Sequence, residues 1–310
     1  MRLDRGLVPG SGRSLRVLGA LPLSLGVLLA CAAPLAASGA GPRHVVEKAR
    51  SGPLTALLSY LETPQTHSYL LDGKTTTFTD DVDSEFRLSL VRSGRLLFSR
   101  LLGCSYCEPA GLEADHPQPS LHFALLRAGK DPQVLLDLYT GGAHCCFTTD
   151  ILVTGGTGTR MIKQLWGDPG YRLSDLDHNG LSEFVTADDR FAYAFTDYAA
   201  SLLPIKILRL EGSSLADVTR SHPAEIAADA ESLWALYLKV RLGPEPDVRG
   251  VLAAWAADEA LLGRWTAASA ALDLALARGD LDQGPLLRGW PRGRAYITAL
   301  HTFLRVSGYL

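Results

Sequence analysis

The sequence lacks an excess of positive charge. Its 310 residues carry 30 Lys and Arg against 33 Asp and Glu, a formal net charge of −3 at pH 7. Binding nucleic acid over a broad surface requires clustered Lys and Arg, so we expect no nucleic-acid partner. With 47% hydrophobic and 20% charged residues, the composition suits a packed core, and the length suits two domains of ordinary size.

Signatures of well-known catalytic sites are absent too. The chain has neither Gly-x-Ser-x-Gly nor His-Glu-x-x-His, which would mark a serine nucleophile or a zinc helix. Residues 155–158 lack the Gly-Lys-Ser/Thr ending of a phosphate loop and predict a hairpin tip. We therefore assign no catalytic residue. One alternative stays open, a secreted hydrolase using Asp188 or Asp189 near His144; the competing interpretation pairs these carboxylates with Arg190.

Long apolar runs are lacking except at the N-terminus. Arginines precede the apolar residues 17–30, and small residues follow them, the layout of a secretory signal peptide. We predict that residues 1–40 are this signal and that the mature chain is secreted or in the cell envelope, without a transmembrane segment. A second hypothesis stays open, because Leu28–Cys31 resembles a lipobox in which Cys31 would be lipidated.

Cysteine is scarce, and its number fits export. Four cysteines lie outside the signal, and an even number in an oxidising compartment predicts two disulfides. Three pairings are compatible with the sequence. Zinc binding by these cysteines with His144 is the alternative, but adjacent cysteines are poor tetrahedral ligands. The disulfide candidates are Cys104, Cys107, Cys145 and Cys146.

Alternating apolar and polar residues predict strands in the first two thirds of the chain. Residues 86–92 and 95–99 flank Ser93-Gly94, which is typical of a β-hairpin. Residues 75–78 are strand-like or a loop. Further strands are expected at residues 54–60, 121–126, 133–139, 147–154, 160–165, 184–187, 191–195 and 205–210.

The period changes to that of a helix near Ser221. Pro223 suits a first helical position, and Gly243-Pro244 ends that helix. Three more helices are expected at about 248–262, 267–277 and 291–306. The fold class is therefore α+β, with a β-rich, propeller-like or sandwich-like domain at 43–220 and a small all-helical domain at 221–310.

One acidic loop carries chemistry. Residues 175–183 match D-x-D-x-N-G-x-x-E, which places oxygen side chains at alternate positions around a glycine turn. Calcium prefers six to eight oxygen ligands. The residue twelve positions along is Thr186 rather than glutamate, so this is not a complete EF-hand. We predict calcium as the cofactor, and the alternative is an Asx turn that satisfies its own backbone. The predicted ligands are Asp175, Asp177, Asn179, the carbonyl of Leu181, and Glu183.

The acidic loop and the strand after it resemble FG-GAP/VCBS-type repeats of extracellular adhesion and carbohydrate-associated proteins. Residues 125–134 resemble a degenerate repeat without acidic ligands. The chain from about Ala49 to Tyr309 is similar to a family of uncharacterised exported actinobacterial proteins. This resemblance implies a calcium role for the loop's side chains and no activity. The segments that carry it are residues 137–146, 166–173 and 186–195.

These observations favour an exported calcium-binding protein. We expect a binding or structural module without catalytic activity, whose partner is an extracellular protein or carbohydrate. Calcium would hold the acidic loop and add its binding free energy to folding stability.

Overall fold

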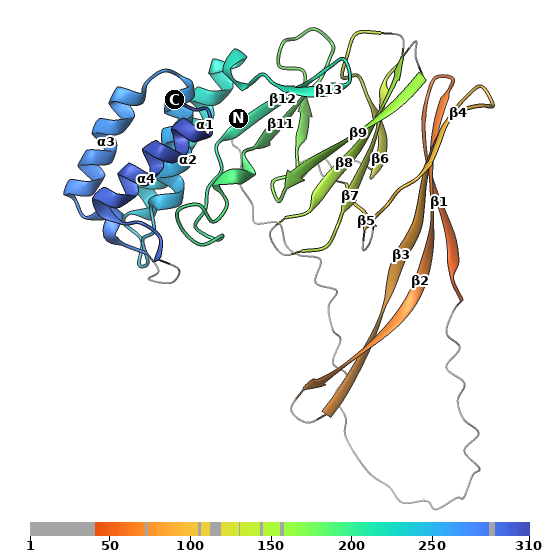
Figure 1. Cartoon of the computed structure of the whole chain (residues 1–310), viewed down its shortest axis with the longest axis horizontal. Coiled ribbons are helices and arrows are strands. Elements are labelled where there is room, and N and C mark those ends of the chain that lie inside the picture. Colours follow the sequence, from red (N-terminus) through yellow and green to blue (C-terminus); the bar gives the residue numbers. More distant parts are fainter. Residues whose placement is uncertain are drawn as a thin grey trace, which may run out of the picture.

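The computed structural model shows three antiparallel sheets followed by four α-helices (Figure 1). The predicted signal peptide, Cys31 and His144 lie outside the described residues. Within the described part, no helix is long and apolar enough to cross a bilayer. The described residues are 41–71, 74–104, 107–111, 119–129, 131–142, 145–155, 158–284 and 289–310.

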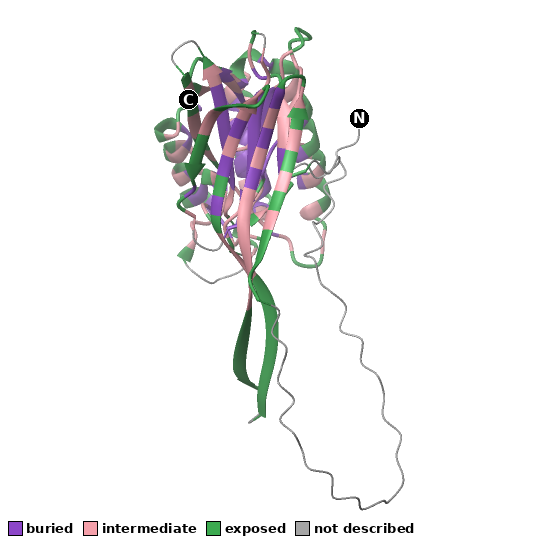
Figure 2. Cartoon of the chain, turned by 90° about the vertical axis from the view of Figure 1, so that its right-hand side faces the viewer, coloured by how far each residue is buried: buried purple, intermediate pink, exposed green. Residues whose placement is uncertain are grey.

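The first sheet is a meander of four strands with one very long hairpin. Its central strands β2 and β3 are much longer than the sequence predicted, because pairing continues past the body through the strand-like residues 75–78. The far half of this hairpin is exposed (Figure 2). The strands are β1 (Arg43–Ser51), β2 (Leu54–Leu71), β3 (Lys74–Arg92) and β4 (Arg95–Leu101).

The central strands β7 and β8 of the middle sheet are buried on both faces. Alternate residues of its central strand β7 face two cores: Leu136 packs with the first sheet, and Leu135 packs with the third. This explains why β7 is apolar along most of its length. The strands are β5 (Glu108–Pro109), β6 (Leu121–Ala124), β7 (Gln133–Tyr139), β8 (Phe147–Gly155) and β9 (Gly158–Gly167).

The third sheet lies between the middle sheet and the helices (Figure 1). Its strands pair in chain order, and Phe184 and Leu208 pack toward the middle sheet. Within the described residues no sheet closes into a barrel or a propeller. The strands are β10 (Arg172–Ser174), β11 (Glu183–Ala187), β12 (Ile205–Glu211) and β13 (Ser214–Asp217).

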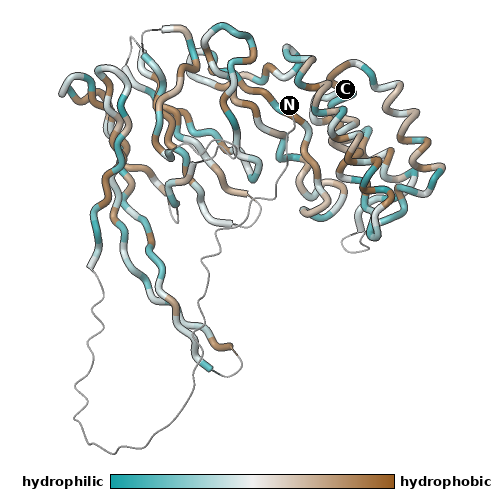
Figure 3. The backbone as a smooth tube through the Cα atoms, turned by 180° about the vertical axis from the view of Figure 1, so that it is seen from behind, coloured by the Kyte–Doolittle hydropathy of each residue, from teal (hydrophilic) through white to brown (hydrophobic). Residues whose placement is uncertain are grey.

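The helices fall close to their predicted positions. Pro223 occupies the first turn of α1 as predicted, and α2 is buried along most of its length. Figure 3 shows apolar residues along the helices and the body strands, whereas the long hairpin is mainly polar until its tip. The helices are α1 (Pro223–Val240), α2 (Arg249–Leu261), α3 (Trp265–Ala277) and α4 (Gly293–Val306).

One predicted strand is wrong. Residues 191–195 form the end of a 3-10 helix, η1 (Asp189–Phe191), and a turn. The aromatic rings drive this difference, because Phe191 and Phe195 are both buried in the core of the helices. Phe195 lies 5.5 Å from the ring of Tyr296. Two rings four residues apart reach the same core from a turn, whereas a strand would spread them along a sheet.

Candidate functional site

The acidic loop, residues 175–183, connects β10 to β11 and closes on its own backbone. The carboxylate of Asp175 accepts hydrogen bonds from the backbone N–H groups of Asn179 at 2.9 Å and Gly180 at 2.8 Å. The Asn179 amide oxygen accepts from Leu181 at 2.8 Å. Gly180 takes a φ of 82°, as a tight turn requires. The loop is therefore curled by its side chains, which satisfy its own backbone as the Asx-turn alternative predicted.

A basic side chain from the neighbouring strand supplies positive charge to this loop. Arg209 on β12 donates from Nε to the buried Glu183 at 3.0 Å, and its terminal nitrogen donates to Asp177. The second oxygen of Glu183 accepts from the backbone N–H of Leu176 at 3.0 Å. Nothing in the sequence singled out Arg209, because β12 carries the charged residues Lys206 and Glu211 as well.

The oxygens of the acidic loop do not fit a calcium ion as they are placed. Both oxygens of Glu183 are engaged, and Arg209 lies between Glu183 and Asp177. Calcium requires six to eight oxygens around one point. In the part of the chain that the structure describes, no group of three or more His, Cys, Asp or Glu residues is placed to hold a metal. Calcium binding stays a prediction, and the cation of the loop in this conformation is Arg209.

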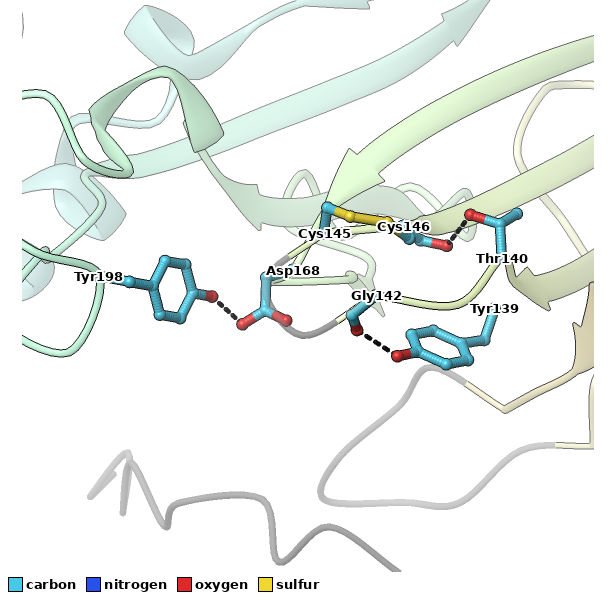
Figure 4. Close-up of a disulfide and its surroundings, with 7 residues drawn as sticks. All are labelled: Tyr139, Thr140, Gly142, Cys145, Cys146, Asp168 and Tyr198. Carbon is cyan, nitrogen blue, oxygen red and sulfur yellow. Dashed lines mark hydrogen bonds between the residues drawn. A yellow bond between two sulfur atoms is a disulfide. The ribbon is translucent and has the colours of Figure 1, made fainter. Parts of the chain in front are cut away.

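The cysteines pair with their sequence neighbours. The disulfides are Cys104–Cys107 and Cys145–Cys146, which chooses among the three pairings that the sequence allowed. Cys145–Cys146 packs directly against Gly142, where a Cβ would lie 2.8 Å from both sulfurs. Figure 4 shows this disulfide with the Cys146 carbonyl accepting from the Thr140 hydroxyl at 3.0 Å. The adjacent-cysteine turn is thus fixed in place.

A cavity of about 550 Å³ lies beside this disulfide. We call it the inter-sheet cavity, because strands of the middle and third sheets line it. Trp166 and Leu208 contribute apolar surface, while Lys206 contributes an ammonium group. Its other main walls are the disulfide Cys145–Cys146, Phe147, Thr148, Asp188 and Asp189.

Two residues that line the cavity each have a buried oxygen with no hydrogen-bond partner within the described residues. The oxygens are Oγ1 of Thr148, a residue only 4% exposed, and Oδ1 of Asp189. Burial raises the pKa of the Asp189 carboxyl, and the carboxylates of Asp168 and Asp188 raise it further, against a hydrogen bond from the Asp168 backbone. An unpaired buried polar group is costly, and both oxygens belong to residues that line the cavity.

Asp189 approaches the backbone closely at Gly167. A Cβ at position 167 would collide with the Asp189 carboxyl group, and Gly167 has a φ of 71°. The neighbouring Asp168 accepts a hydrogen bond from the Tyr198 hydroxyl (Figure 4). Burial raises the pKa of Tyr198, and Asp168 adds to the shift. The end of β9 thus positions Asp189 at the cavity wall.

Asp188 has a structural role. Its carboxylate accepts from Arg190 through Nε at 2.8 Å and from the Tyr309 hydroxyl at 2.8 Å. Burial alone would raise the pKa of Asp188, but the hydrogen bonds from Arg190 and Tyr309 outweigh it and lower the pKa. Asp188 therefore pairs with Arg190, as the competing interpretation anticipated, and it also ties the end of β11 to the C-terminus through Tyr309. Of the two carboxylates in the hydrolase hypothesis, only Asp189 has an oxygen left unpaired at the cavity.

A buried polar network lies between the same two sheets. The carboxylate of Asp137, 1% exposed, accepts from the hydroxyls of Thr149 at 2.6 Å and Tyr171 at 3.0 Å. Trp166 donates from its indole nitrogen to Thr149 at 2.7 Å. This network fixes the Trp166 ring that lines the cavity. The sequence offered one signal for it, an acidic residue inside the apolar strand β7.

Comparison with known proteins gives two informative relatives. No family model matches the sequence, and no solved structure matches it. An uncharacterized protein of Sinorhizobium fredii, y4bJ, is 31% identical over 236 residues, covering 72% of this chain and 36% of that protein. A probable thylakoid lumen protein of Synechocystis, sll0997, is 31% identical over 138 residues, covering 43% of this chain and 40% of that protein.

The chain thus spans 40% or less of the length of these curated relatives. Neither relative's name mentions FG-GAP or VCBS repeats. The resemblance of the acidic loop to those repeats, and that of the chain to an exported actinobacterial family, therefore stay hypotheses.

Proposed function

We propose that the chain is an extracytoplasmic binding module whose inter-sheet cavity holds a small, hydroxyl-rich ligand of carbohydrate type. Three observations support the compartment. The N-terminus has the layout of an export signal, four cysteines form two disulfides, which persist in oxidising compartments, and one relative is named as a probable thylakoid lumen protein.

The observation that carries the binding proposal is the pair of unpartnered oxygens, Thr148 Oγ1 and Asp189 Oδ1, which belong to two residues that line the cavity. A buried polar side chain without a partner in a native protein calls for an explanation, and a ligand that supplies the missing hydrogen bond is the one proposed here. The threonine hydroxyl donates or accepts, and the carboxylate accepts. A ligand hydroxyl, which is both donor and acceptor, satisfies either group.

The remaining walls of the cavity fit the same ligand class. Its volume of about 550 Å³ lies within the range of roughly 300–1,000 Å³ of small-molecule sites. Phe147 and the Cys145–Cys146 disulfide offer apolar surface to the C–H face of a sugar ring, and Lys206 offers a donor to its oxygens. The cavity has room for a small molecule rather than for a protein segment, which favours the carbohydrate over the protein as partner.

The proposal is tested by ligand-observed NMR with glucose, galactose, mannose and myo-inositol as probes. We expect at least one probe to bind the wild-type protein and to bind Asp189→Asn at least about tenfold more weakly, because a charge-assisted hydrogen bond contributes about 1.5–3 kcal/mol. The matched control is Asp273→Asn, an exposed carboxylate on α3 that pairs with Arg294. Absence of binding by all four probes, or equal binding by the Asp189 variant, would overturn the proposal.

Hydrolysis is the second candidate function, and one observation favours it. Burial raises the pKa of Asp189, which suits a general acid at the cavity. The test is turnover of nitrophenyl glycosides by the wild-type protein, with Asp189→Asn as the inactive variant. A protein that binds a sugar but does not hydrolyse the nitrophenyl glycosides would be a binding module and not a hydrolase.

A further inference from the structure

The outer half of the β2–β3 hairpin projects from the body as a separate arm (Figures 1 and 2). We call residues 61–71 and 74–84 the hairpin arm. It begins at a register irregularity between Ser59 and Leu61, where Glu85 on the facing strand has a φ of 57°. Such a bulge sharpens the twist of a ribbon, and it turns the arm away from the sheet.

The hairpin arm has two unlike faces. Residues opposite each other on a ribbon share a face, and successive pairs alternate. The pairs His67–Phe78 and Tyr69–Thr76 lie on the same face. Three aromatic rings therefore meet there, and the Phe78 ring lies 5.1 Å from the His67 ring and 6.1 Å from the Tyr69 ring. We call this side the aromatic face, and its residues are Gln65, His67, Tyr69, Leu71, Lys74, Thr76, Phe78 and Asp80.

The opposite side is a hydroxyl face. The side chains of Thr66 and Thr79 hydrogen-bond across it at 3.0 Å. Leu70 and Asp81 also belong to this side, because they lie in the alternate pairs. The two faces therefore differ in chemistry while sharing the same backbone, which provides matched control positions.

The aromatic face carries exposed apolar side chains beside its polar ones. Tyr69 is 47% exposed, Leu71 57% and Phe78 50%. A two-stranded ribbon is marginally stable in water by itself, so a second layer packed on the aromatic face would stabilise it. The charged residues on this face indicate which partner packs against it and in which orientation.

We propose that the aromatic face of the hairpin arm docks against the same face of a second copy of this chain, in antiparallel orientation. A twofold axis crossing the ribbon midway between the Tyr69–Thr76 and His67–Phe78 pairs places like strand over like strand. Lys74 at the tip then lies opposite Asp80 of the other copy. The twofold axis repeats this contact, so Asp80 lies opposite Lys74 of the other copy. Such a twofold contact is isologous and closes at two copies.

Charge complementarity favours antiparallel arms over arms that point the same way. Asp80 is about half exposed and accepts from His67 Nε2 at 2.9 Å, which leaves carboxylate capacity for Lys74 of the other copy. If the two arms pointed the same way, Lys74 would instead lie over Leu71 of the other copy, and no opposite charges would meet. Opposite charges across an interface fix its register.

Sedimentation velocity over a wide range of concentration tests the proposal. We expect the full chain to form a reversible dimer, because a contact confined to one face of a two-stranded arm is at the small end of specific interfaces. Tyr69→Ser and Asp80→Lys should each weaken dimerisation by about tenfold or more. The double variant Lys74→Asp/Asp80→Lys restores opposite charges in both contacts and should recover most of the lost affinity.

The hydroxyl face supplies the controls, Leu70→Ser for Tyr69→Ser and Asp81→Lys for Asp80→Lys. Both controls should dimerise like the wild type. A wild-type chain that is monomeric at every concentration would overturn the proposal, as would equal effects of substitutions on the two faces or no recovery in the double variant. A monomer that cosediments with phosphatidylcholine vesicles, and loses this with Tyr69→Ser, would assign the aromatic face to a lipid surface instead.

Discussion

Arg209 donates its Nε–H to Glu183 at 3.0 Å, one residue beyond the cross-strand pair Phe184–Leu208. Glu183 is fully buried, whereas the Arg209 side chain is 29% exposed. Arg209 on β12 therefore pairs with Glu183 at the start of β11 and also with Asp177 of the acidic loop.

Removing Arg209 should destabilise the fold strongly. Arg209→Gln leaves the buried Glu183 carboxylate without its cation, and breaking a buried pair costs about 3–5 kcal/mol. Urea denaturation should show this loss in the free energy of unfolding. Glu183→Gln in the same chain removes the uncompensated charge and should recover a large part of it. A loss below about 1 kcal/mol in Arg209→Gln would contradict the assignment of Arg209 as the loop's cation.

Adding calcium should show whether the acidic loop binds calcium, as the sequence predicts, or is neutralised by Arg209, as the structure places it. While Arg209 neutralises Asp177 and Glu183, we expect calcium to change the melting temperature of the wild type little. In Arg209→Gln the loop carboxylates become free, and calcium should raise the melting temperature. Adding Asp175→Ala should abolish that rise. A calcium response already present in the wild type, and lost in Asp175→Ala, would confirm the sequence prediction of a calcium loop instead.

Asp83 should make stability depend on pH. Burial raises its pKa from an ordinary value of 3.8 to about 6, and the carboxylate of Glu62, directly across the ribbon, adds to the shift. Because the folded-state pKa exceeds the unfolded one, the penalty is absent below pH 4, grows through pH 6 and is complete above it. Asp83→Asn should then raise stability at pH 7 but not at pH 3.5. Solvent screening limits the gain to about 1 kcal/mol. Equal effects at both pH values would contradict this linkage.

The two disulfides should differ in their effects. Each closes a very short loop, so replacing either pair by serine should cost only about 1–2 kcal/mol in unfolding free energy. Only Cys145–Cys146 lines the inter-sheet cavity. Its double serine variant should weaken monosaccharide binding in the NMR assay, and the Cys104/Cys107 variant should not. Equal binding by both variants would remove the disulfide from the proposed site.

The local features of this protein follow from its sequence. Pro223 and the helical spacing after it placed the C-terminal helices, and alternation placed most strands, because the core-facing period is a property of each segment alone. The Asp175 spacing likewise determined a curled loop, since Asp175, Asn179 and Gly180 close it through bonds within nine residues.

Tertiary structure decided everything that joins distant segments. Arg209 meets Glu183 only because β12 pairs with β11, and Thr148 and Asp189 line one cavity only because the middle and third sheets pack together. Phe191 and Phe195 leave their predicted strand because the helices offer them a core. The sequence also left the cysteine pairing open, because it does not say whether Cys104 and Cys107 lie close to Cys145 and Cys146. Local sequence sets the preference of each segment, whereas burial and charge pairing depend on which segments the fold brings into contact.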